Sequence, residues 1–294
     1  MKYIILIITI FSSTILFSQS KGLSNTFNHT TLINGQTTEM MAKDSWEFRI
    51  QHRFGQVGLD STLYEEFLGL DMPANIRFAF NYYISDRLYI GIGRTKYNKT
   101  FDFEAKYKLL NQTNYGSMPI SLAIYSNLTY NSSDQPKAIA PSLFANIVDG
   151  DTIPFEYSNA HRIAYNSQII ISRKVNSKLS LQVAHTIIYK NLTVATEDNL
   201  TAIMIASGRY KFGLRTSVLF EYAYKLNNVI DNPYNELDNH WSLGYEFATS
   251  GHAFQIVMST SSHLVEQDIY TSKPADFIAN KFILGFNIRR TIWK

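Results

Sequence analysis

The chain has 294 residues, of which 14% are aromatic and only 17% are charged. Its 27 Lys and Arg against 24 Asp and Glu exclude the strongly basic surface of a nucleic-acid-binding domain. It has no cysteine, which excludes disulfides, thiolate catalysis and cysteine-ligated metals. The mean hydropathy of -0.13 disfavours a bundle of membrane helices. It is compatible with a membrane β-barrel, because half of each barrel strand is polar.

Residues 1–18 have the features of a secretory signal peptide, with a basic start, an apolar run and a small residue before Gln19. A transmembrane helix needs about 20 apolar residues, and the hydroxyl residues at 12–14 interrupt this run. We therefore expect a secreted chain whose mature form begins near Gln19. Residues 19–43 are polar and rich in Thr and Asn. We expect this segment either to lie inside a lumen, where it would form a plug, or to hang free.

Alternation of apolar and polar residues predicts β-strands throughout residues 44–294, which we treat as one domain. In Trp46–Gly55 the even positions up to Phe54 are apolar or aromatic apart from a histidine, whereas the odd positions up to Arg53 are charged or carry an amide. Successive side chains of a strand point to opposite faces, so this strand separates two different media. No segment has a helical period. We expect twelve strands, at about 46–55, 76–82, 88–93, 101–109, 120–130, 161–174, 179–191, 201–212, 216–226, 240–249, 252–262 and 280–293.

The connections between these strands alternate in length. Long connections follow the first, fifth, seventh, ninth and eleventh strands, and short ones follow most of the others. Outer-membrane barrels have short periplasmic turns, long external loops and an even number of strands. We therefore predict an all-β, up-and-down antiparallel transmembrane β-barrel in the lipid bilayer of the outer membrane, with a soluble secreted β-protein as the alternative. Trp46 and Trp293 would both lie at the periplasmic end, as in an interfacial aromatic belt.

Several short segments of the chain also resemble an uncharacterised family of bacterial outer-membrane β-barrel proteins, the domain-of-unknown-function family 5777. These segments are His52-Arg-Phe-Gly55, Phe67-Leu-Gly-Leu-Asp71, Gly91-Ile-Gly93-Arg94, His161-Arg162 with Tyr165, Arg173-Lys174, Leu179-Ser-Leu181, Gly251-His-Ala-Phe254 and Gly285-Phe-Asn-Ile-Arg289. They spread over nearly the whole mature chain. The resemblance implies a barrel in the outer membrane of a Gram-negative bacterium, and it brings no assigned activity.

The sequence offers few candidates for catalysis. Its seven histidines form neither a His-x-His nor a His-Glu-x-x-His pattern, so we expect no metal site. Asp102 and Glu104 could act as paired carboxylates, but lysines continue the same strand face, which favours a ladder of luminal charges. His52 and His185 have the apolar parity of their strands, yet no Gly-x-Ser-x-Gly motif supplies a serine nucleophile. We predict no catalytic residues, no cofactor and no enzymatic activity.

The polar face of the strands is the best lead to a function. By strand parity it carries eleven cations against five carboxylates, and such an excess in a narrow lumen would attract anions. The alternative is that Arg–Glu networks fill the lumen and close it. Lys190, Lys225 and Glu47 belong to that count, and the principal lumen-lining candidates are Arg49, Arg53, Arg77, Asp102, Glu104, Lys106, Lys108, Arg162, Arg209, Lys211, Glu221, Glu246 and Arg289.

Three functions remain open on the sequence. The first is a porin-like, small and weakly anion-selective channel with an anionic solute as its cargo. The second is a closed structural barrel whose loops at 55–75 and 131–160 bind an outer-membrane protein. The third, ranked last, is an outer-membrane enzyme that acts on lipid.

Overall fold

The computed structural model describes residues 25–113, 118–134, 146–148, 151–153, 157–193, 198–226, 239–276 and 279–293. The predicted signal peptide at 1–18 and the first residues of the 19–43 segment lie outside this part of the chain. Among the described residues, no helix has the length and apolarity needed to cross a membrane.

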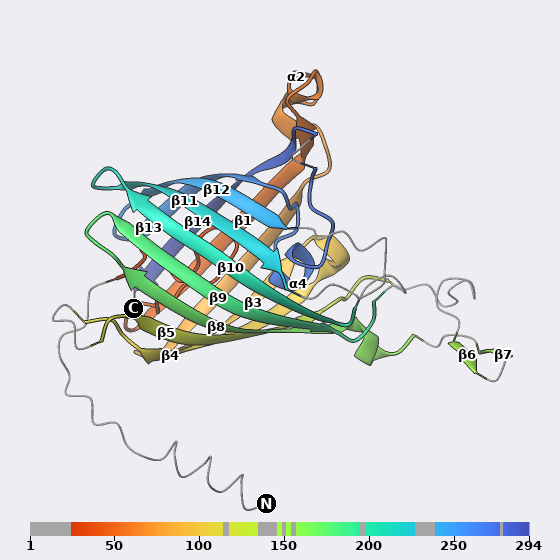
Figure 1. Ribbon diagram of the computed structural model, residues 1–294, viewed down its shortest axis with the longest axis horizontal. Helices are drawn as coiled ribbons and strands as arrows, with labels where there is room; N and C mark the ends of the chain where they lie inside the picture. Colours follow the sequence, from red (N-terminus) through yellow and green to blue (C-terminus); the bar gives the residue numbers. More distant parts are fainter. Residues whose placement is uncertain are drawn as a thin grey trace, which may run out of the picture.

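In the described residues, twelve antiparallel strands close into a barrel (Figure 1). Each strand pairs with its neighbours in sequence, and β1 pairs with β14 to close the ring, with Ser45 opposite Trp293. The predicted up-and-down topology is confirmed, and every predicted strand is present. The strands are β1 (Ser45–Gly58), β2 (Asn75–Ser85), β3 (Leu88–Thr95), β4 (Phe101–Leu110), β5 (Ser121–Tyr130), β8 (Ile163–Lys174), β9 (Leu179–Lys190), β10 (Leu200–Lys211), β11 (Thr216–Lys225), β12 (His240–Ala248), β13 (His252–Ser259) and β14 (Lys281–Trp293).

Short elements occupy the connections at one end of the barrel, which we call the loop end. They are α2 (Thr62–Glu65), η1 (Phe67–Gly69), η2 (Tyr97–Lys99), the hairpin strands β6 (Asn146–Val148) and β7 (Asp151–Ile153), η3 (Asn159–Arg162) and α4 (Glu266–Ile269). Each has three or four residues, too few to show a periodic pattern, and none was predicted. We call the opposite end, with its short β8–β9, β10–β11 and β12–β13 turns, the turn end (Figure 1).

Side chains alternate between the outer surface and the lumen as the sequence predicts. On β4, Asp102, Glu104 and Lys106 are buried, whereas Phe101 and Phe103 are exposed. The same alternation on the other strands surrounds the barrel with exposed aromatic and aliphatic residues. An apolar outer surface on a closed sheet satisfies the requirement that no backbone polar group meets lipid unpaired.

The two tryptophans at the seam between β1 and β14 differ in direction. Trp46 lies on the outer surface at the turn end, where its ring meets that of Tyr82 with a centroid separation of 4.4 Å. Trp293 is opposite Ser45, whose side chain faces the lumen, so Trp293 has the luminal parity. Both tryptophans lie at the same end of the barrel, as the sequence predicts, but only Trp46 fits a belt on the outer surface.

Candidate functional site: an occupied lumen

Residues 25–43 lie inside the turn-end half of the lumen, where we call them the N-terminal plug (Figure 1). The plug reverses direction in a tight turn, in which the Leu32 N–H donates to the Gly35 carbonyl at 2.9 Å. The Thr37 N–H donates to the Thr30 carbonyl, also at 2.9 Å. Most of its side chains between Thr26 and Glu39 are buried. Of the two alternatives left by the sequence for the 19–43 segment, the structure shows the lumen for its described part, residues 25–43.

The tip of the plug binds to one carboxylate of the barrel wall. Glu221 on β11 accepts hydrogen bonds from the backbone N–H groups of Ile33 at 2.8 Å, Asn34 at 2.9 Å and Gly35 at 3.0 Å. Consecutive N–H groups that converge on one anion form a backbone nest, and bonds to an ionised acceptor are stronger than neutral ones. Arg53 adds a bond of 2.8 Å to the Asn34 side chain. Glu221 is therefore the main anchor of the plug tip.

Donors from several wall strands satisfy the carbonyl groups of the plug. A backbone carbonyl that is buried without a partner is costly, so these donors fix the path of the plug through the lumen. They come from β4, β9, β13 and β14, on different sides of the barrel. The bonds run from Lys106 to the Thr30 carbonyl (2.6 Å), from Ser180 to Thr26 (2.5 Å), from Gln182 to Gln36 (2.7 Å), from Gln255 and Arg289 to Leu32 (2.9 and 2.8 Å), and from Asn287 to Ile33 (3.0 Å).

Apolar contacts also hold the plug. Phe27, Leu32 and Ile33 form one buried cluster with Leu219 of β11 and Val257 of β13. The side chains of both wall residues point into the lumen. Apolar side chains that faced only water there would not stabilise the barrel. Burial of one such side chain contributes about 1.5–3 kcal/mol. These apolar luminal positions are the signal in the sequence that could have indicated an occupied lumen.

A second inserted segment fills the loop-end half of the lumen. We call residues 260–276 the α4 loop. Gln267 donates to the Asn127 side chain at 2.6 Å, and Glu266 accepts bonds from Asn166 and, at 2.7 Å, from Gln168. Ile269 and Tyr270 pack on luminal apolar residues of the wall, namely Tyr125, Ile170, Ala184, Ile188, Ile203, Ile205 and Ala223.

Where the plug meets the α4 loop, almost no space remains. Two internal voids of about 10 Å³ each lie between them, one bordered by Asn34 and Glu266 and the other by Asn34 and Tyr270. A void of this size has room for about one water molecule. In the part of the chain that the structure describes, the lumen is therefore closed at its middle.

Most of the predicted lumen-lining residues lie together in the wall. Arg49 pairs with Glu104 and Arg77 with Asp102, both at 2.5 Å, and Arg209 pairs with Glu246 at 3.3 Å. Lys108 and Lys211 have luminal parity near the turn end and are partly exposed. Ten of the thirteen candidates are buried on the luminal face, namely Arg49, Arg53, Arg77, Asp102, Glu104, Lys106, Arg209, Glu221, Glu246 and Arg289.

The placement of Arg162 in the lumen is wrong. It belongs to η3 at the loop end, because β8 begins only at Ile163, and strand parity does not extend into the helical turn. Its guanidinium donates to the carbonyls of Asn131 at 3.0 Å and Ser133 at 2.8 Å.

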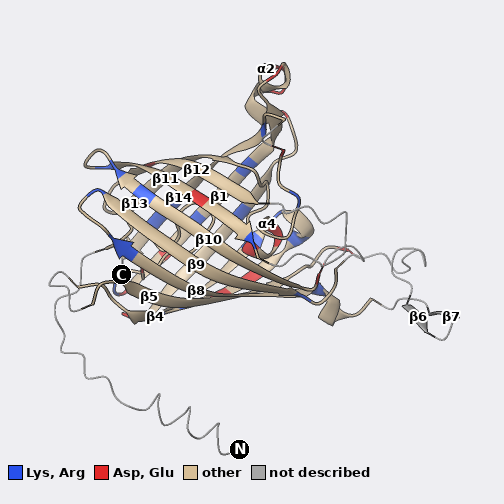
Figure 2. Ribbon diagram, in the orientation of Figure 1, with Lys and Arg blue, Asp and Glu red and all other residues tan. Residues whose placement is uncertain are grey.

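The inserted segments also change the charge of the lumen. They bring acidic residues that a count over strand residues omits, and Figure 2 shows acidic residues on α4 at the loop end. Glu39 of the plug lies 3.9 Å from Lys108, and Asp268 of the α4 loop lies 3.7 Å from Lys190. Glu266 of the α4 loop is buried as well, but burial raises its pKa to about 8, so it contributes little negative charge at neutral pH. The cationic excess of the filled lumen is thus smaller than the strand residues alone predict.

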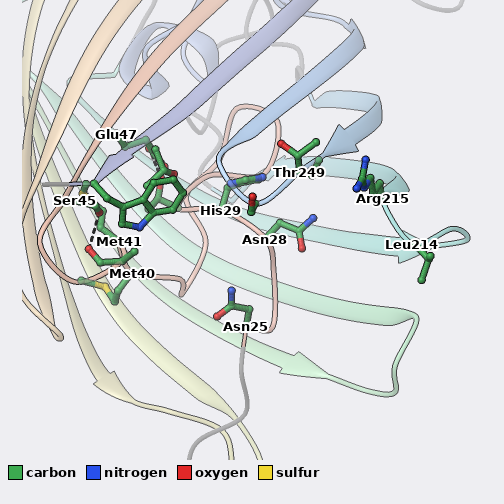
Figure 3. Close-up of a pocket in the computed structure, with 16 residues that line it drawn as sticks. Asn25, Asn28, His29, Met40, Met41, Ser45, Glu47, Leu214, Arg215 and Thr249 are labelled. Carbon is green, nitrogen blue, oxygen red and sulfur yellow. Dashed lines mark hydrogen bonds between the residues drawn. The ribbon is translucent and has the colours of Figure 1, made fainter.

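A large cavity opens at the turn end of the barrel (Figure 3). Its volume is about 530 Å³, and both the plug and the barrel rim line it. The plug contributes Asn28, His29 and Met41, whereas the rim contributes Arg215 and Trp293. A smaller cavity of about 220 Å³ lies at the loop end, beside His263.

The two histidines with apolar parity lie on the outer surface. His52 stacks on Phe286 with a centroid separation of 5.0 Å. His185 lines a groove of about 380 Å³ together with Ser126 and Ser167. The Ser126 hydroxyl donates to the Asn166 carbonyl at 3.1 Å, and in the described residues neither serine is hydrogen-bonded to His185. Nor do those residues contain a group of three or more His, Asp or Glu that could hold a metal ion.

A closed antiparallel sheet with an apolar outer surface and a lumen of polar and charged residues defines a transmembrane β-barrel. The family model described as membrane bound beta barrel domain (DUF5777) matches residues 27–292, and the chain belongs to this family. The resemblance found in the sequence is confirmed. The match begins within the plug, so the plug is part of the family's domain.

The solved structure of the NanC porin supports the same architecture. The NanC porin is similar over 84% of this chain and 99% of its own, with 8% identity and a TM-score of 0.50. The KdgM porin is similar over 84% of this chain and 98% of its own, with 10% identity and a TM-score of 0.47. OmpT of Vibrio cholerae is similar over 83% of this chain and 77% of its own, with 13% identity and a TM-score of 0.35. At such identities the likeness concerns the fold alone. No curated protein matches the chain.

Proposed function

We propose that this protein is an outer-membrane channel that is closed at rest and passes small anionic solutes once the plug and the α4 loop leave the lumen. The turn end then faces the periplasm and the loop end the exterior. The observation that carries the proposal is how the plug is held. Side chains of the rigid wall bind its backbone through separate hydrogen bonds, so it can leave while the sheet of the barrel stays intact. Twelve strands lie between the small barrels that side chains fill and the wide porins, so a barrel of this size can hold an insert and can conduct once the insert leaves.

Departure of the plug would leave the wall basic. Arg53, Lys106 and Arg289 lose the plug oxygens that they now bind, and Lys108 loses Glu39. Among the carboxylates, Glu221 loses its partners in the plug. Three luminal arginines keep carboxylate partners within the wall, in the pairs Arg49–Glu104, Arg77–Asp102 and Arg209–Glu246. A constriction lined by unpaired cations favours anions.

A cysteine lock across the plug tests this function. The hydroxyl oxygens of Thr38 in the plug and Ser172 on β8 are 2.5 Å apart, and the chain has no cysteine of its own. We expect Thr38→Cys with Ser172→Cys to show no single-channel steps in a planar bilayer when oxidised. Reduction should restore the steps, and a salt gradient should then give a reversal potential that indicates anion preference.

The matched control pairs Ser126→Cys with Ser167→Cys. These hydroxyls are 3.4 Å apart on the outer surface, and the pair links two wall strands without touching the plug. Its conductance should be the same in the oxidised and reduced states. Conductance of the oxidised plug lock would contradict the plug's role. A protein that never conducts, even when residues 25–43 and the α4 loop are both deleted, would contradict the channel itself, and a cation preference would contradict the proposed solute.

The loop end favours a second candidate function, a closed barrel that binds a protein partner. Beyond Arg53, β1 pairs only with β14, and this two-stranded ribbon carries α2 away from the barrel (Figure 1). At its tip Tyr64 is 73% exposed and Phe67 62% exposed. Clustered exposed apolar residues mark interaction surfaces. Acidic residues at 60, 65, 66 and 71 surround them, so the partner would present a basic, apolar surface.

Replacing Tyr64 and Phe67 with Ser tests this second function. We expect the double variant to lose a protein that cross-links to the wild type in intact cells, while its barrel remains folded. Leu214→Ser is the matched control, since Leu214 is 93% exposed at the turn end. An identical set of cross-linked proteins in all three samples would count against the loop as a docking site. We do not propose an enzymatic function, because no described serine is hydrogen-bonded to His185.

A further inference from the structure

The turn-end cavity has the volume of a ligand site, and the plug and the barrel rim together form its walls. Its volume of about 530 Å³ falls within the range of about 300–1,000 Å³ that is typical of small-molecule sites. Figure 3 shows Asn28 and His29 of the plug on one side and Arg215 and Thr249 of the rim on another. A molecule in this space would touch both the plug and the barrel.

The polar groups in the cavity suit an anion that also carries hydroxyl groups. Arg215, in the β10–β11 turn, is exposed, and no ion pair of its guanidinium is found in the described residues. A free guanidinium binds a carboxylate through two parallel hydrogen bonds. The side chain of His29 lines the cavity, and burial lowers the pKa of His29 to about 4. A neutral imidazole can donate or accept one hydrogen bond to a hydroxyl.

The acidic residue in the cavity wall does not oppose an anion. Glu47 is buried, accepts a bond from the Thr30 hydroxyl at 2.7 Å and lies 3.5 Å from Arg49. Its charge is therefore matched within the wall, and Arg215 sets the charge at the mouth.

An aromatic ring completes the cavity. Trp293 lines it and is 52% exposed, and a Cβ atom added to Gly251 would lie 3.1 Å from its ring. The β12–β13 turn thus supports one side of the indole. An amphipathic ring of this kind offers a flat apolar face to a ligand that is polar elsewhere. Met40 and Met41 add further apolar surface.

From these groups we propose that the turn-end cavity is a binding site for a carboxylated saccharide. The carboxylate meets Arg215, the hydroxyls meet the side chains of Asn28, His29 and Thr249, and one face of the sugar ring covers Trp293. A simple anion would leave the indole unused, and a neutral sugar would leave Arg215 unpaired.

Occupancy of the cavity by the ligand would also hold the channel closed, an effect that rests on the proposed function. The ligand contacts the plug and the rim together, so it binds the plugged barrel more tightly than the open one. A ligand shifts an equilibrium toward the state that it binds better.

Calorimetric titration of the mature protein in detergent tests the site with three probes. N-acetylmuramic acid differs from N-acetylglucosamine only by a lactyl ether that carries a carboxylate, and lactate supplies that carboxylate alone. We expect N-acetylmuramic acid to bind at least about 10-fold more tightly than either of the others. Arg215→Gln should lower its affinity to that of N-acetylglucosamine. Trp293→Leu should weaken both sugars, and Trp293→Phe, which keeps a ring, should retain them.

Arg290→Gln is the matched control, because Arg290 is exposed on the outer face of β14 at the same end. Equal affinity for lactate and N-acetylmuramic acid would overturn the saccharide assignment, and no binding, or binding unchanged in Arg215→Gln and Trp293→Leu, would overturn the site. Binding is measured without conductance, so a protein that binds but never conducts would contradict the channel alone. Binding that leaves the conductance of the reduced plug lock unchanged would overturn the coupling.

Discussion

Replacing Glu221 with Ala should release the tip of the N-terminal plug. The change leaves the N–H groups of Ile33, Asn34 and Gly35 in the lumen without their acceptor. A buried donor that loses its partner costs about 1–3 kcal/mol, so docking of the tip should weaken by about 3 kcal/mol or more. Because each 1.4 kcal/mol is a factor of ten, hydrogen exchange at these three amides should become at least roughly 100-fold faster.

Hydrogen exchange followed by mass spectrometry of peptides from the plug measures this release. Glu221→Gln should have a smaller effect, since its amide oxygen still accepts but carries no charge. Asp102→Asn is the matched control: Asp102 is a buried luminal carboxylate that pairs with Arg77 rather than with the plug. Exchange in the plug that is equally slow in the wild type and Glu221→Ala would show that Glu221 is not the anchor. If the channel proposal holds, Glu221→Ala should also open more often than the wild type.

Raising the pH from about 5 to 8 should loosen the α4 loop. Burial raises the pKa of Glu266 to about 8, and the nearby Glu104 acts in the same direction, against hydrogen bonds from Gln168 and Asn166. A released α4 loop would expose Glu266 to water, where its pKa would return to the ordinary 4.5. Between these two values the docked loop holds a proton that the released loop has lost. Docking therefore weakens with rising pH, by about 1.4 kcal/mol per unit, and the loss ends near pH 8.

Limited proteolysis within the α4 loop, at a series of pH values and with a protease of broad pH range, measures this change. Cleavage of the wild type should become faster from pH 5 to pH 8, whereas cleavage of Glu266→Gln should stay slow throughout, because an amide has no charge to bury. Asp268→Asn is the control within the same helix, since Asp268 pairs with Lys190 and is less buried. The control should keep the dependence of the wild type. An identical pH profile for Glu266→Gln and the wild type would refute the assignment to Glu266.

The position of the plug could not be predicted from the sequence, for a physical reason. Residues 25–43 have no periodic pattern, and their polar side chains would be equally at home in water. The donors that hold them, such as Lys106 and Gln255, would also be expected in the wall of a water-filled pore. Only the apolar residues with luminal parity, such as Leu219 and Val257, indicate a partner inside the barrel. Even these do not show which segment covers them.

The sequence by itself determined the barrel and the two faces of its wall. Parity is a local property of an extended chain, so Phe103 and Glu104 point to opposite sides whatever lies beyond them. Only the tertiary structure decided that the lumen is closed. That outcome depends on contacts between residues far apart in the chain, such as Glu221 with Ile33 across 188 positions and Gln267 with Asn127 across 140. The neighbours of a residue in the sequence determine the direction of its side chain, whereas the folded barrel determines which residues that side chain contacts.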